Sequence, residues 1–354
     1  MIKTIVPIGG EPFYSPRKLF VLPKNNIRKY FLERFSGKHL TYTYGGYYSL
    51  RVILQHIKIS KDEKILLPSY MCPTILFPFK ELDIKYEFYR VDRNLIIDID
   101  DLAKRVNEKT KAAFFINYFG FNQPDKVKNV LIKLKELGII IVQDVVQDFY
   151  VPNEEIIGDY AFISFRKFFP CEGSVIISND EIGDVVIKGK NKAYFSDKLK
   201  GRFWRYCHYK YGCNEKRFLV AFENAHDAYH LPKNIKFRSY DEYVLNRIDF
   251  EKDKETRQNN FKILLEHFSN SAVFKSLPDN VVPLVFPVFV NDRNNFKRKL
   301  RENNIFCPVH WRLSDEVENN EYKESWRLSE NILSIPINTN IDYMLVVKCL
   351  RSMI

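Results

Sequence analysis

Glycine is scarce in this sequence of 354 residues, with 13 copies, and no low-complexity segment or internal repeat is present. Collagen-like and largely disordered chains are poor in apolar residues, whereas 45% of this chain is hydrophobic and 15% aromatic. Those classes are therefore excluded, and we expect a folded globular protein. At about 150 residues per domain, the length predicts roughly two domains, or a large domain with a smaller one.

The sequence also lacks a long apolar run. No stretch approaches the roughly 18 apolar residues that a membrane-spanning helix needs. The apolar stretch within residues 1–18 is too short for the core of a signal peptide, and no small-residue cleavage site follows it. We therefore expect a soluble, cytoplasmic protein with no membrane partner.

Cysteine is sparse, and the six copies are dispersed, so we expect free thiols and not the dense disulfide framework of a small secreted domain. Two spacings superficially resemble metal sites. Cys207 and Cys213 have five residues between them, outside the roughly two to four of structural zinc sites. His226 and His230 lack both the glutamate of a zinc hydrolase helix and a third ligand. We predict no metal site.

The net charge is +11, from 55 Lys and Arg against 44 Asp and Glu, but no long basic block is present. A Lys-rich solvated surface therefore explains the charge better than a nucleic-acid-binding surface, and we predict no nucleic-acid partner. A phosphorylated small molecule or an acidic surface stays compatible with this charge.

Short β-rich apolar runs alternate with helical stretches from about residue 45 to 180, which indicates a mostly parallel sheet with helices on its faces. The clearest helix lies between Pro124 and Gly138, because its apolar residues recur at i, i+3, i+4 and i+7. The predicted strands are residues 64–68, 84–91, 112–117, 139–143, 160–165 and 174–177.

The second half of the chain begins with residues 190–270, which lack strand signals and predict helices and a long excursion. The alternation then resumes with residues 281–290, a polar helix near 291–302, and a strand in 305–310. We predict an α/β protein with a large domain, residues 1–245, and a smaller C-terminal α/β domain, residues 246–354.

Ligands of open α/β sheets bind outside the carboxyl ends of the strands, so polar residues there carry the most weight. An acid closes one apolar run in residues 143–147 (QDVVQ), and a hydroxyl, a guanidinium and an amine close the next in residues 164–167 (SFRK). Two glycines precede a helix in residues 44–50 (YGGYYSL). Their N–H groups favour a phosphate.

An amine, a carboxylate and a phosphate cradle are what pyridoxal 5′-phosphate requires, since its aldehyde, its ring nitrogen and its phosphate each need a partner. Each feature alone is common in proteins without a cofactor. An Asp at a strand end is usually a turn residue, and a Lys after an aromatic strand is usually solvated. All three in this order along the chain favour the cofactor site.

The sequence resembles the DegT/DnrJ/EryC1/StrS family of sugar aminotransferases, within the fold-type I pyridoxal-phosphate enzymes. The resemblance covers most of the chain. It is carried by the helix start at Gly46, residues 67–70 (LPSY), 117–120 (NYFG), 143–147 (QDVVQ), 158–167 (GDYAFISFRK) and 305–311 (IFCPVHW). By this resemblance, we expect the fold-type I architecture and a homodimer.

The same resemblance implies roles for individual residues. Lys167 would bind the cofactor covalently and move a proton between cofactor and substrate, and Asp144 would pair with the ring nitrogen. Gln147 would hydrogen-bond the ring hydroxyl, while Ser164 and the helix start at Gly46 and Tyr47 would contact the phosphate.

Three departures from the family pattern stand out. Cys72 occupies a position where the family often carries an aromatic that stacks on the cofactor ring, so Tyr70 or Tyr118 would supply that face. The stretch with which a neighbouring subunit reaches the phosphate is not recognisable between residues 200 and 230. Lys167 follows Ser164 by three residues, a shorter spacing than is common in the family.

His310 and Trp311 fall where the small domain of the family reaches the active site, so we expect substrate contacts there, with Tyr118 as a third candidate. The resemblance implies amino transfer from an amino acid, with glutamate as the expected donor, to a nucleotide-linked keto sugar for surface polysaccharide or secondary metabolite biosynthesis. Arg202, Arg205 and Arg312 are the cations available for the diphosphate. Two alternatives stay open: another fold-type I reaction on an amino acid, or a catalytically silent regulator or scaffold that binds the cofactor.

Overall fold

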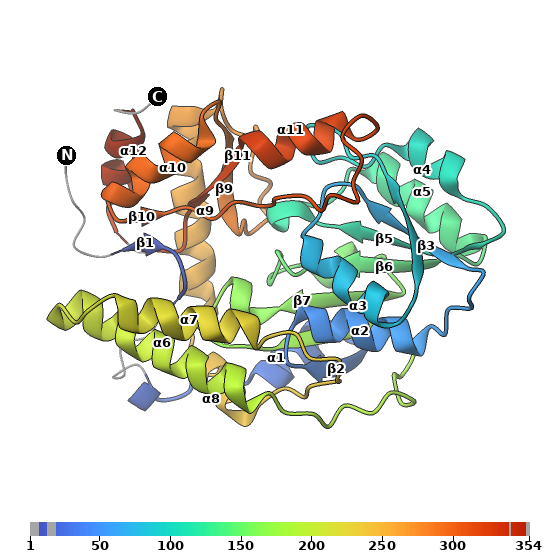
Figure 1. The fold of residues 1–354 in the computed structure, drawn as a ribbon, viewed down its shortest axis with the longest axis horizontal. Coiled ribbons are helices and arrows are strands. Elements are labelled where there is room, and N and C mark those ends of the chain that lie inside the picture. Colours follow the sequence, from blue (N-terminus) through green and yellow to red (C-terminus); the bar gives the residue numbers. More distant parts are fainter. Residues whose placement is uncertain (1–6, 13–18, 340, 352–354) are drawn as a thin grey trace.

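A seven-stranded sheet forms the centre of the protein, of which a computed structural model describes residues 7–12, 19–339 and 341–351 (Figure 1). Its strand order is β2-β8-β7-β6-β5-β3-β4. Strand β8 runs antiparallel to β7 and β2, and the other neighbouring strands pair in parallel. The strands are β2 (His39–Thr43), β3 (Lys64–Pro68), β4 (Lys85–Tyr89), β5 (Thr110–Ile116), β6 (Ile140–Asp144), β7 (Tyr160–Ser164) and β8 (Ser174–Ser178).

The mostly parallel sheet is confirmed, and its central strands are buried on both faces. Such strands read as continuous apolar runs in the sequence, which is why five of the predicted ranges overlap β3 to β7 and a sixth overlaps β8. Strand β2 was not predicted, because its sequence HLTYT has neither a long apolar run nor a clean alternation.

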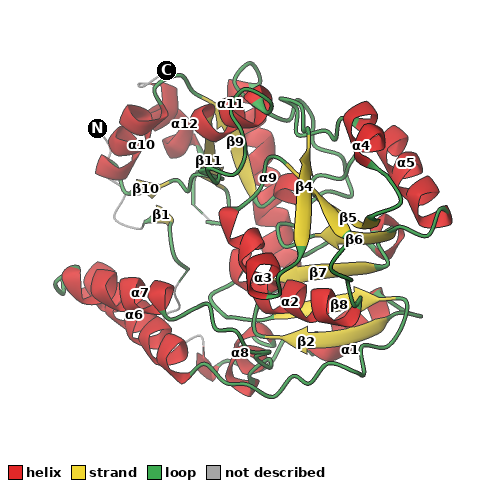
Figure 2. Ribbon diagram, turned by 45° about the vertical axis from the view of Figure 1, so that its right-hand side comes forward, coloured by secondary structure: helices red, strands yellow, loops and turns green. Residues whose placement is uncertain are grey.

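The helices around the sheet include α5 (Asp125–Glu136), which begins after Pro124 and buries Val127, Leu131 and Leu134. Gly138 follows its end with φ of 83°, a conformation that favours glycine. The other helices of this part are α1 (Ile27–Arg34), α2 (Gly46–His56), α3 (Leu76–Glu81), α4 (Ile99–Arg105), α6 (Lys192–Tyr211), α7 (Lys216–Asp227) and α8 (Ser239–Leu245). Helices α6 and α7 lie side by side as a long hairpin at one side of the molecule (Figure 2).

The C-terminal part contains two short sheets. Strands β9 (Val285–Phe289) and β11 (Ile332–Pro336) pair antiparallel, and β1 (Ile8–Gly9) pairs in parallel with β10 (Ile305–Phe306). The strand predicted over residues 305–310 is shorter than expected, because Pro308 has no N–H to donate. The helices here are α9 (Phe250–Phe268), α10 (Arg293–Glu302), α11 (Lys323–Asn331) and α12 (Met344–Arg351).

The domain boundary predicted at residues 245 and 246 falls between α8 and α9, and the division there stays a prediction. Strand β1 comes from the N-terminal part of the chain and yet pairs with β10 of the C-terminal part. Short 3₁₀ turns follow several strands of the large sheet, over Pro73–Ile75, Tyr118–Gly120, Asn153–Glu155 and Phe165–Lys167. Within the described part of the chain, no helix combines the length and the apolarity needed to cross a bilayer.

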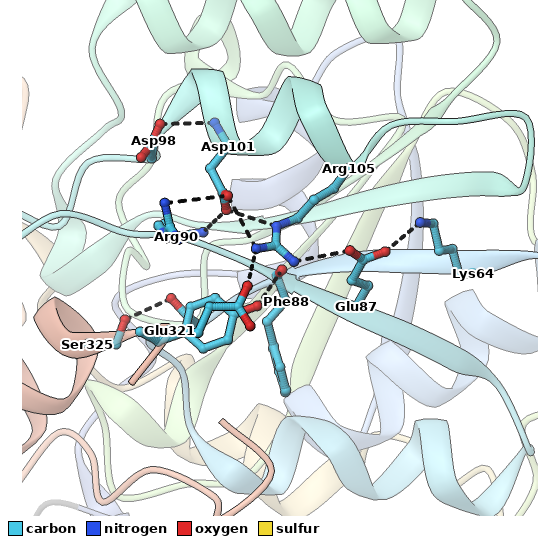
Figure 3. A network of polar contacts seen from close by, with 11 residues as sticks. Lys64, Glu87, Phe88, Arg90, Asp98, Asp101, Arg105, Glu321 and Ser325 are labelled. Atoms are coloured by element: carbon cyan, nitrogen blue, oxygen red, sulfur yellow. Dashed lines mark hydrogen bonds and ion pairs between the residues drawn. The ribbon is translucent and has the colours of Figure 1, made fainter. Parts of the chain in front are cut away.

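A polar network joins the segment before α11 to the edge of the large sheet (Figure 3). The guanidinium of Arg105, at the end of α4, lies 2.9 Å from Asp101, 3.1 Å from Glu87 and 2.5 Å from Glu321. Burial opposes the charge of Asp101, but hydrogen bonds from Arg105 and from the Arg90 backbone outweigh it, so the pKa of Asp101 is lowered. The network fixes the C-terminal segment against β4 and α4.

Candidate active site

Three of the predicted site residues meet at the carboxyl ends of β6 and β7. Asp144 is the last residue of β6 and Ser164 is the last residue of β7. The 3₁₀ turn after β7 then places Lys167 beside them, and all three line one cavity of about 80 Å³. Chain segments far apart in the sequence complete its wall, with Gly46, Tyr47, Leu50, Cys72, Thr74, Ile75, Ile116, Val146, Phe162, Arg166, Tyr229 and Trp311.

Asp144 is a deeply buried carboxyl group, with 2% of its surface exposed. Its Oδ1 accepts a hydrogen bond of 2.9 Å from the Val146 backbone. Burial raises the pKa of Asp144 from 3.8 to about 7, although the Val146 N–H and the charge of Lys167 act in the opposite direction. Because burial disfavours the charged form of Asp144, a cation brought into the cavity would lower its pKa and stabilise the carboxylate.

Lys167 is partly buried and forms no ion pair with the residues that the structure describes. Loss of hydration and the neighbouring charge of Arg166 lower the pKa of Lys167, against the opposing influence of Cys72, Asp144 and Glu11. A lowered pKa increases the fraction of neutral amine at neutral pH. A neutral amine is what the predicted role of Lys167 as nucleophile and proton carrier requires.

Two buried hydroxyl groups of the cavity wall, those of Ser164 and Tyr229, have no hydrogen-bond partner among the described residues. Nε2 of Gln147 also lacks a partner there, although Gln147 does not line this cavity. The other amide atom of Gln147, Oε1, accepts from the Phe119 backbone at 2.8 Å. Leaving a buried donor unpaired costs about 1–3 kcal/mol. The unpartnered hydroxyls of the cavity wall are thus suited to a ligand that offers oxygen atoms, and the contact of Gln147 with the ring hydroxyl stays a prediction.

The start of helix α2 faces the same cavity through Gly46 and Tyr47. Gly45 precedes the helix and offers no side chain to cap it. A Cβ at Gly46 would lie 3.1 Å from the Val146 side chain, so the glycine allows the helix end to approach the end of β6. The uncapped N–H groups of the first turn are then available to an anion.

An aromatic group on one wall of the cavity is Trp311, whose ring centroid lies 5.5 Å from that of Tyr70 and 6.3 Å from that of Tyr118. Both tyrosines are buried behind it: Tyr118 donates to the Tyr70 backbone oxygen at 2.6 Å, and Tyr70 donates to the His310 backbone oxygen. Trp311 lines the cavity, whereas Tyr70 and Tyr118, predicted to face the cofactor ring, do not. Cys72 contributes its thiol, 3.1 Å from the Thr74 hydroxyl.

His310 is a buried neutral residue next to Lys167. Both line a second cavity of about 280 Å³, which adjoins the first. Burial and the charge of Lys167 lower the pKa of His310 to about 3. Its Nδ1 lies 2.8 Å from the Ser334 hydroxyl, which holds the ring in place.

The cations proposed for a diphosphate are placed differently from one another. Arg202 pairs with Glu172 at 2.8 Å, Arg205 donates to the Gly9 backbone oxygen at 3.0 Å, and Arg312 is exposed. Arg202 and Arg205 of α6 are buried and contact other groups of this chain. The sequence does not reveal this burial.

Among the wall residues to which sequence reasoning gave no role, two carry polar groups near the start of α2 or beside Lys167, namely Tyr229 and Arg166. The guanidinium of Arg166 lies 4.3 Å from the centre of the Tyr229 ring. Arg166 stands next to Lys167 in the sequence, and that adjacency was the available signal. Tyr229 follows α7 in a segment without periodicity, so only the three-dimensional structure brings it to the site.

Comparison with known proteins shows low sequence similarity and extensive structural similarity. A GDP-perosamine synthase from Vibrio cholerae is 21% identical over 183 residues, which cover 49% of this chain and 48% of that protein. A GDP-4-keto-6-deoxy-D-mannose 3-dehydratase from Yersinia pseudotuberculosis is 25% identical over 132 residues, covering 35% of this chain and 33% of that protein. The chain thus spans about half the length of the first relative and a third of the second. No family model matches the chain.

Two solved structures illustrate the structural similarity. A DegT/DnrJ/EryC1/StrS aminotransferase from Brucella abortus has a TM-score of 0.67 at 16% identity, covering 92% of this chain and 88% of that one. A Bacillus subtilis protein with bound cofactor PMP has a TM-score of 0.66 at 12% identity, covering 96% of this chain and 78% of that one. The predicted fold is therefore confirmed: this chain has the fold of the DegT/DnrJ/EryC1/StrS aminotransferases.

Proposed function

We propose that this protein is a cytoplasmic pyridoxal-phosphate-dependent aminotransferase that moves an amino group from an amino acid, glutamate by resemblance, to a nucleotide-linked keto sugar. The observation that carries the proposal is the cavity shared by Asp144, Ser164 and Lys167 at the start of α2. A scaffold that merely binds the cofactor has no need of a lysine with a lowered pKa opposite a buried carboxyl group.

Each residue has a distinct task in this mechanism. Lys167 would hold the cofactor through its amine and would then move a proton at Nζ, for which its lowered pKa suits it. Asp144 would accept a hydrogen bond from the ring nitrogen and keep it protonated. Gln147 would donate from its unpartnered Nε2 to the ring oxygen, and Ser164 would donate to the phosphate. The cofactor, when bound, serves as the electron sink for the reacting carbon.

The neighbouring residues would exclude water and orient the substrate. Trp311 and Cys72 cover the cavity, and neutral His310 lies on the side of Lys167 from which the 280 Å³ cavity opens. We propose that the substrate enters through this second cavity and meets His310 and Trp311 there. A neutral imidazole at this place avoids adding charge next to the lysine.

The substrate class is supported by the two curated relatives, since a GDP-perosamine synthase and a GDP-4-keto-6-deoxy-D-mannose 3-dehydratase both act in the chemistry of GDP-linked sugars. The similarity to the dehydratase also supports a second candidate function, removal of water from such a sugar. The two functions differ in their products, an amino sugar in the first and a sugar that has lost a hydroxyl group in the second.

The test of the function is the absorption spectrum of the purified protein loaded with pyridoxal phosphate. We expect glutamate to remove the band of the lysine-bound cofactor and a nucleotide-linked keto sugar to restore it, because the amino group has then left the enzyme. A nucleoside diphosphate should compete with the sugar, less so at high salt, since exposed charges are screened over about 10 Å at 0.1 M. Product analysis separates an amino sugar from a deoxy sugar.

Two results would refute this function. One is a protein that binds no pyridoxal phosphate. The other is restoration of the band by simple keto acids alone, without any effect of nucleotides, which would leave the cofactor chemistry and remove the sugar substrate.

We further propose a homodimer formed through the α6–α7 hairpin. Phe203, Leu219 and Val220 of this hairpin are 52%, 44% and 53% exposed. Exposed apolar side chains on one such hairpin are typical of an interaction surface.

By light scattering, the wild-type protein should have twice the mass of one chain, and Val220→Glu should have the mass of one chain. Leu137→Glu, at a 74% exposed apolar residue after α5, should remain dimeric. A wild-type monomer that turns over would contradict the proposal.

A further inference from the structure

We propose that Arg166 and Tyr229 bind the phosphate group of the cofactor, together with Ser164 and the first N–H groups of α2. In this arrangement, the positive charge opposite the phosphate comes from the chain that also carries Lys167. The inference rests on the proposed function. It adds two residues of this chain to which the sequence motifs gave no role at the phosphate.

The first observation is the position of the Tyr229 hydroxyl at the start of α2. A Cβ placed on Gly45 would lie 2.2 Å from this oxygen, so only a glycine leaves room for the phenol there. Helix α2 spans 11 residues, and its start carries the partial positive charge of the helix dipole. An anion bound to the first turn would therefore be adjacent to the Tyr229 hydroxyl.

The second observation is that buried polar groups in this place lack partners. Ser164 is 1% exposed and Tyr229 is 2% exposed, and neither hydroxyl has a hydrogen-bond partner within the described parts of the chain. Both residues line the cavity, as do Gly46 and Arg166. A phosphate has three terminal oxygens that accept hydrogen bonds, so one ligand satisfies several of these donors at once.

The third observation concerns the charge of Arg166. Its guanidinium lies over the Tyr229 ring at 4.3 Å, and no carboxylate of the described residues is within ion-pair distance of it. Arg202 differs in this respect, because it pairs directly with Glu172 at 2.8 Å. A cation that is largely removed from water and has no counter-ion needs an anion from elsewhere.

The state of Arg166 supports the same view. Burial opposes its charge, but the phenols of Tyr229 and Tyr194 and the carboxylate of Glu172 outweigh burial and raise the pKa of Arg166. It therefore stays charged in the cavity. Its planar group presents several donors, which suits the binding of a phosphate better than a lysine would.

The anion could in principle be the cofactor phosphate or the carboxylate of an amino acid substrate. The cavity favours the phosphate, because Asp144 lies in the same cavity wall as Arg166 and Gly46. A ligand with a basic ring nitrogen and a phosphate matches the acid and the cations of this one cavity. The amino acid carboxylate is the alternative that the experiment must separate.

The experiment measures equilibrium binding of pyridoxal phosphate, of pyridoxal without the phosphate, and of inorganic phosphate. We expect Arg166→Gln to weaken binding of pyridoxal phosphate about 10- to 100-fold, the usual worth of a hydrogen bond to a charged group. Binding of pyridoxal should stay within twofold of wild type. Arg166→Lys should keep an intermediate affinity, and Tyr229→Phe should weaken binding of the phosphate form alone.

Arg34→Gln is a matched control, since the Arg34 guanidinium also lies over a tyrosine ring, 4.5 Å from the centre of Tyr30, and α1 does not contribute to the cavity. Its affinities should equal those of wild type. The far-ultraviolet circular dichroism of each variant shows whether it is folded. If Arg166→Gln is not folded, Arg166→Lys replaces it in the comparison of affinities.

Several results would overturn the inference. If Arg166→Gln weakens binding of pyridoxal phosphate and of pyridoxal equally, the arginine only maintains the shape of the cavity. Unchanged binding of pyridoxal phosphate with a raised KM for the amino acid would assign Arg166 to the substrate carboxylate. If the wild-type protein binds neither pyridoxal phosphate nor pyridoxal, the proposed function fails. If wild type and Arg166→Gln bind pyridoxal phosphate equally tightly, only the role of Arg166 at the phosphate fails.

Discussion

Replacement of Lys167 with alanine is expected to abolish amino transfer and to leave the fold intact. The amine supplies both the covalent link to the cofactor and the proton transfer, and loss of a positioned proton carrier alone costs about 10²- to 10⁴-fold in rate. The fold should survive because Lys167 forms no ion pair with any described residue and lies beside the cation Arg166, which lowers its pKa. Removing one of two neighbouring positive charges does not destabilise the native state.

Borohydride reduction of the loaded wild-type protein followed by peptide mapping measures which lysine carries the cofactor. The label should appear in the peptide that contains Lys167 and be absent from the variant. Lys198→Ala is the matched control, because Lys198 shares the second cavity with Lys167 but is paired with Glu11 at 2.6 Å. It should keep the label on Lys167. A label on another lysine would show that the site is elsewhere.

The carboxyl edge of the large sheet could be predicted from sequence for a physical reason. Parallel strands buried on both faces are continuous apolar runs, so the polar residue that ends each run marks the edge. Asp144 and Ser164 end β6 and β7 in this way, and Lys167 follows within one turn. Their convergence on one cavity then follows from the parallel pairing of β6 with β7.

The packing that builds the other walls could not be predicted from residue patterns, because it joins distant segments. Trp311 was expected at the site only through the family resemblance of residues 305–311. Trp311 covers the site since Tyr70 and Tyr118 are packed behind it and hydrogen-bonded there. Tyr229 lies at the start of α2 because the chain returns to the end of β2 after the α6–α7 hairpin. Tyr44, which follows β2, donates its N–H there to the Ile235 oxygen at 2.9 Å. No periodicity in the sequence encodes these contacts.

Replacement of Asp144 with asparagine should have two opposite effects, a large loss of activity and a gain in stability. The activity falls because a neutral amide does not keep the ring nitrogen of the cofactor protonated, and each displaced pKa unit costs about 1.4 kcal/mol. Affinity for the cofactor should fall as well, since the variant lacks the charge that pairs with the ring. Near-normal turnover would mean that Asp144 is merely a residue of the turn after β6.

The gain in stability should appear in the cofactor-free protein and should depend on pH. The pKa of Asp144 is about 7 in the folded protein against 3.8 ordinarily, so between these values the folded state binds more protons than the unfolded state. The wild-type protein is then destabilised as pH rises through this window, by up to about 4 kcal/mol at pH 8. Asparagine does not titrate, so in urea unfolding Asp144→Asn should be the more stable protein at pH 8, and the difference should shrink toward pH 5.

Asp148 provides the control that separates stability from catalysis. It is 3% exposed, and burial raises its pKa from 3.8 to about 8, yet it does not line the cavity of Lys167. Asp148→Asn should therefore stabilise the cofactor-free protein at pH 8 in the same way while retaining amino transfer. Equal stabilities of wild type and Asp144→Asn at pH 8 would show that the carboxylate of Asp144 is already compensated without a ligand. In that case the carboxylate would not require the cationic ring as its partner, and the reason for placing the cofactor nitrogen at the end of β6 would be lost.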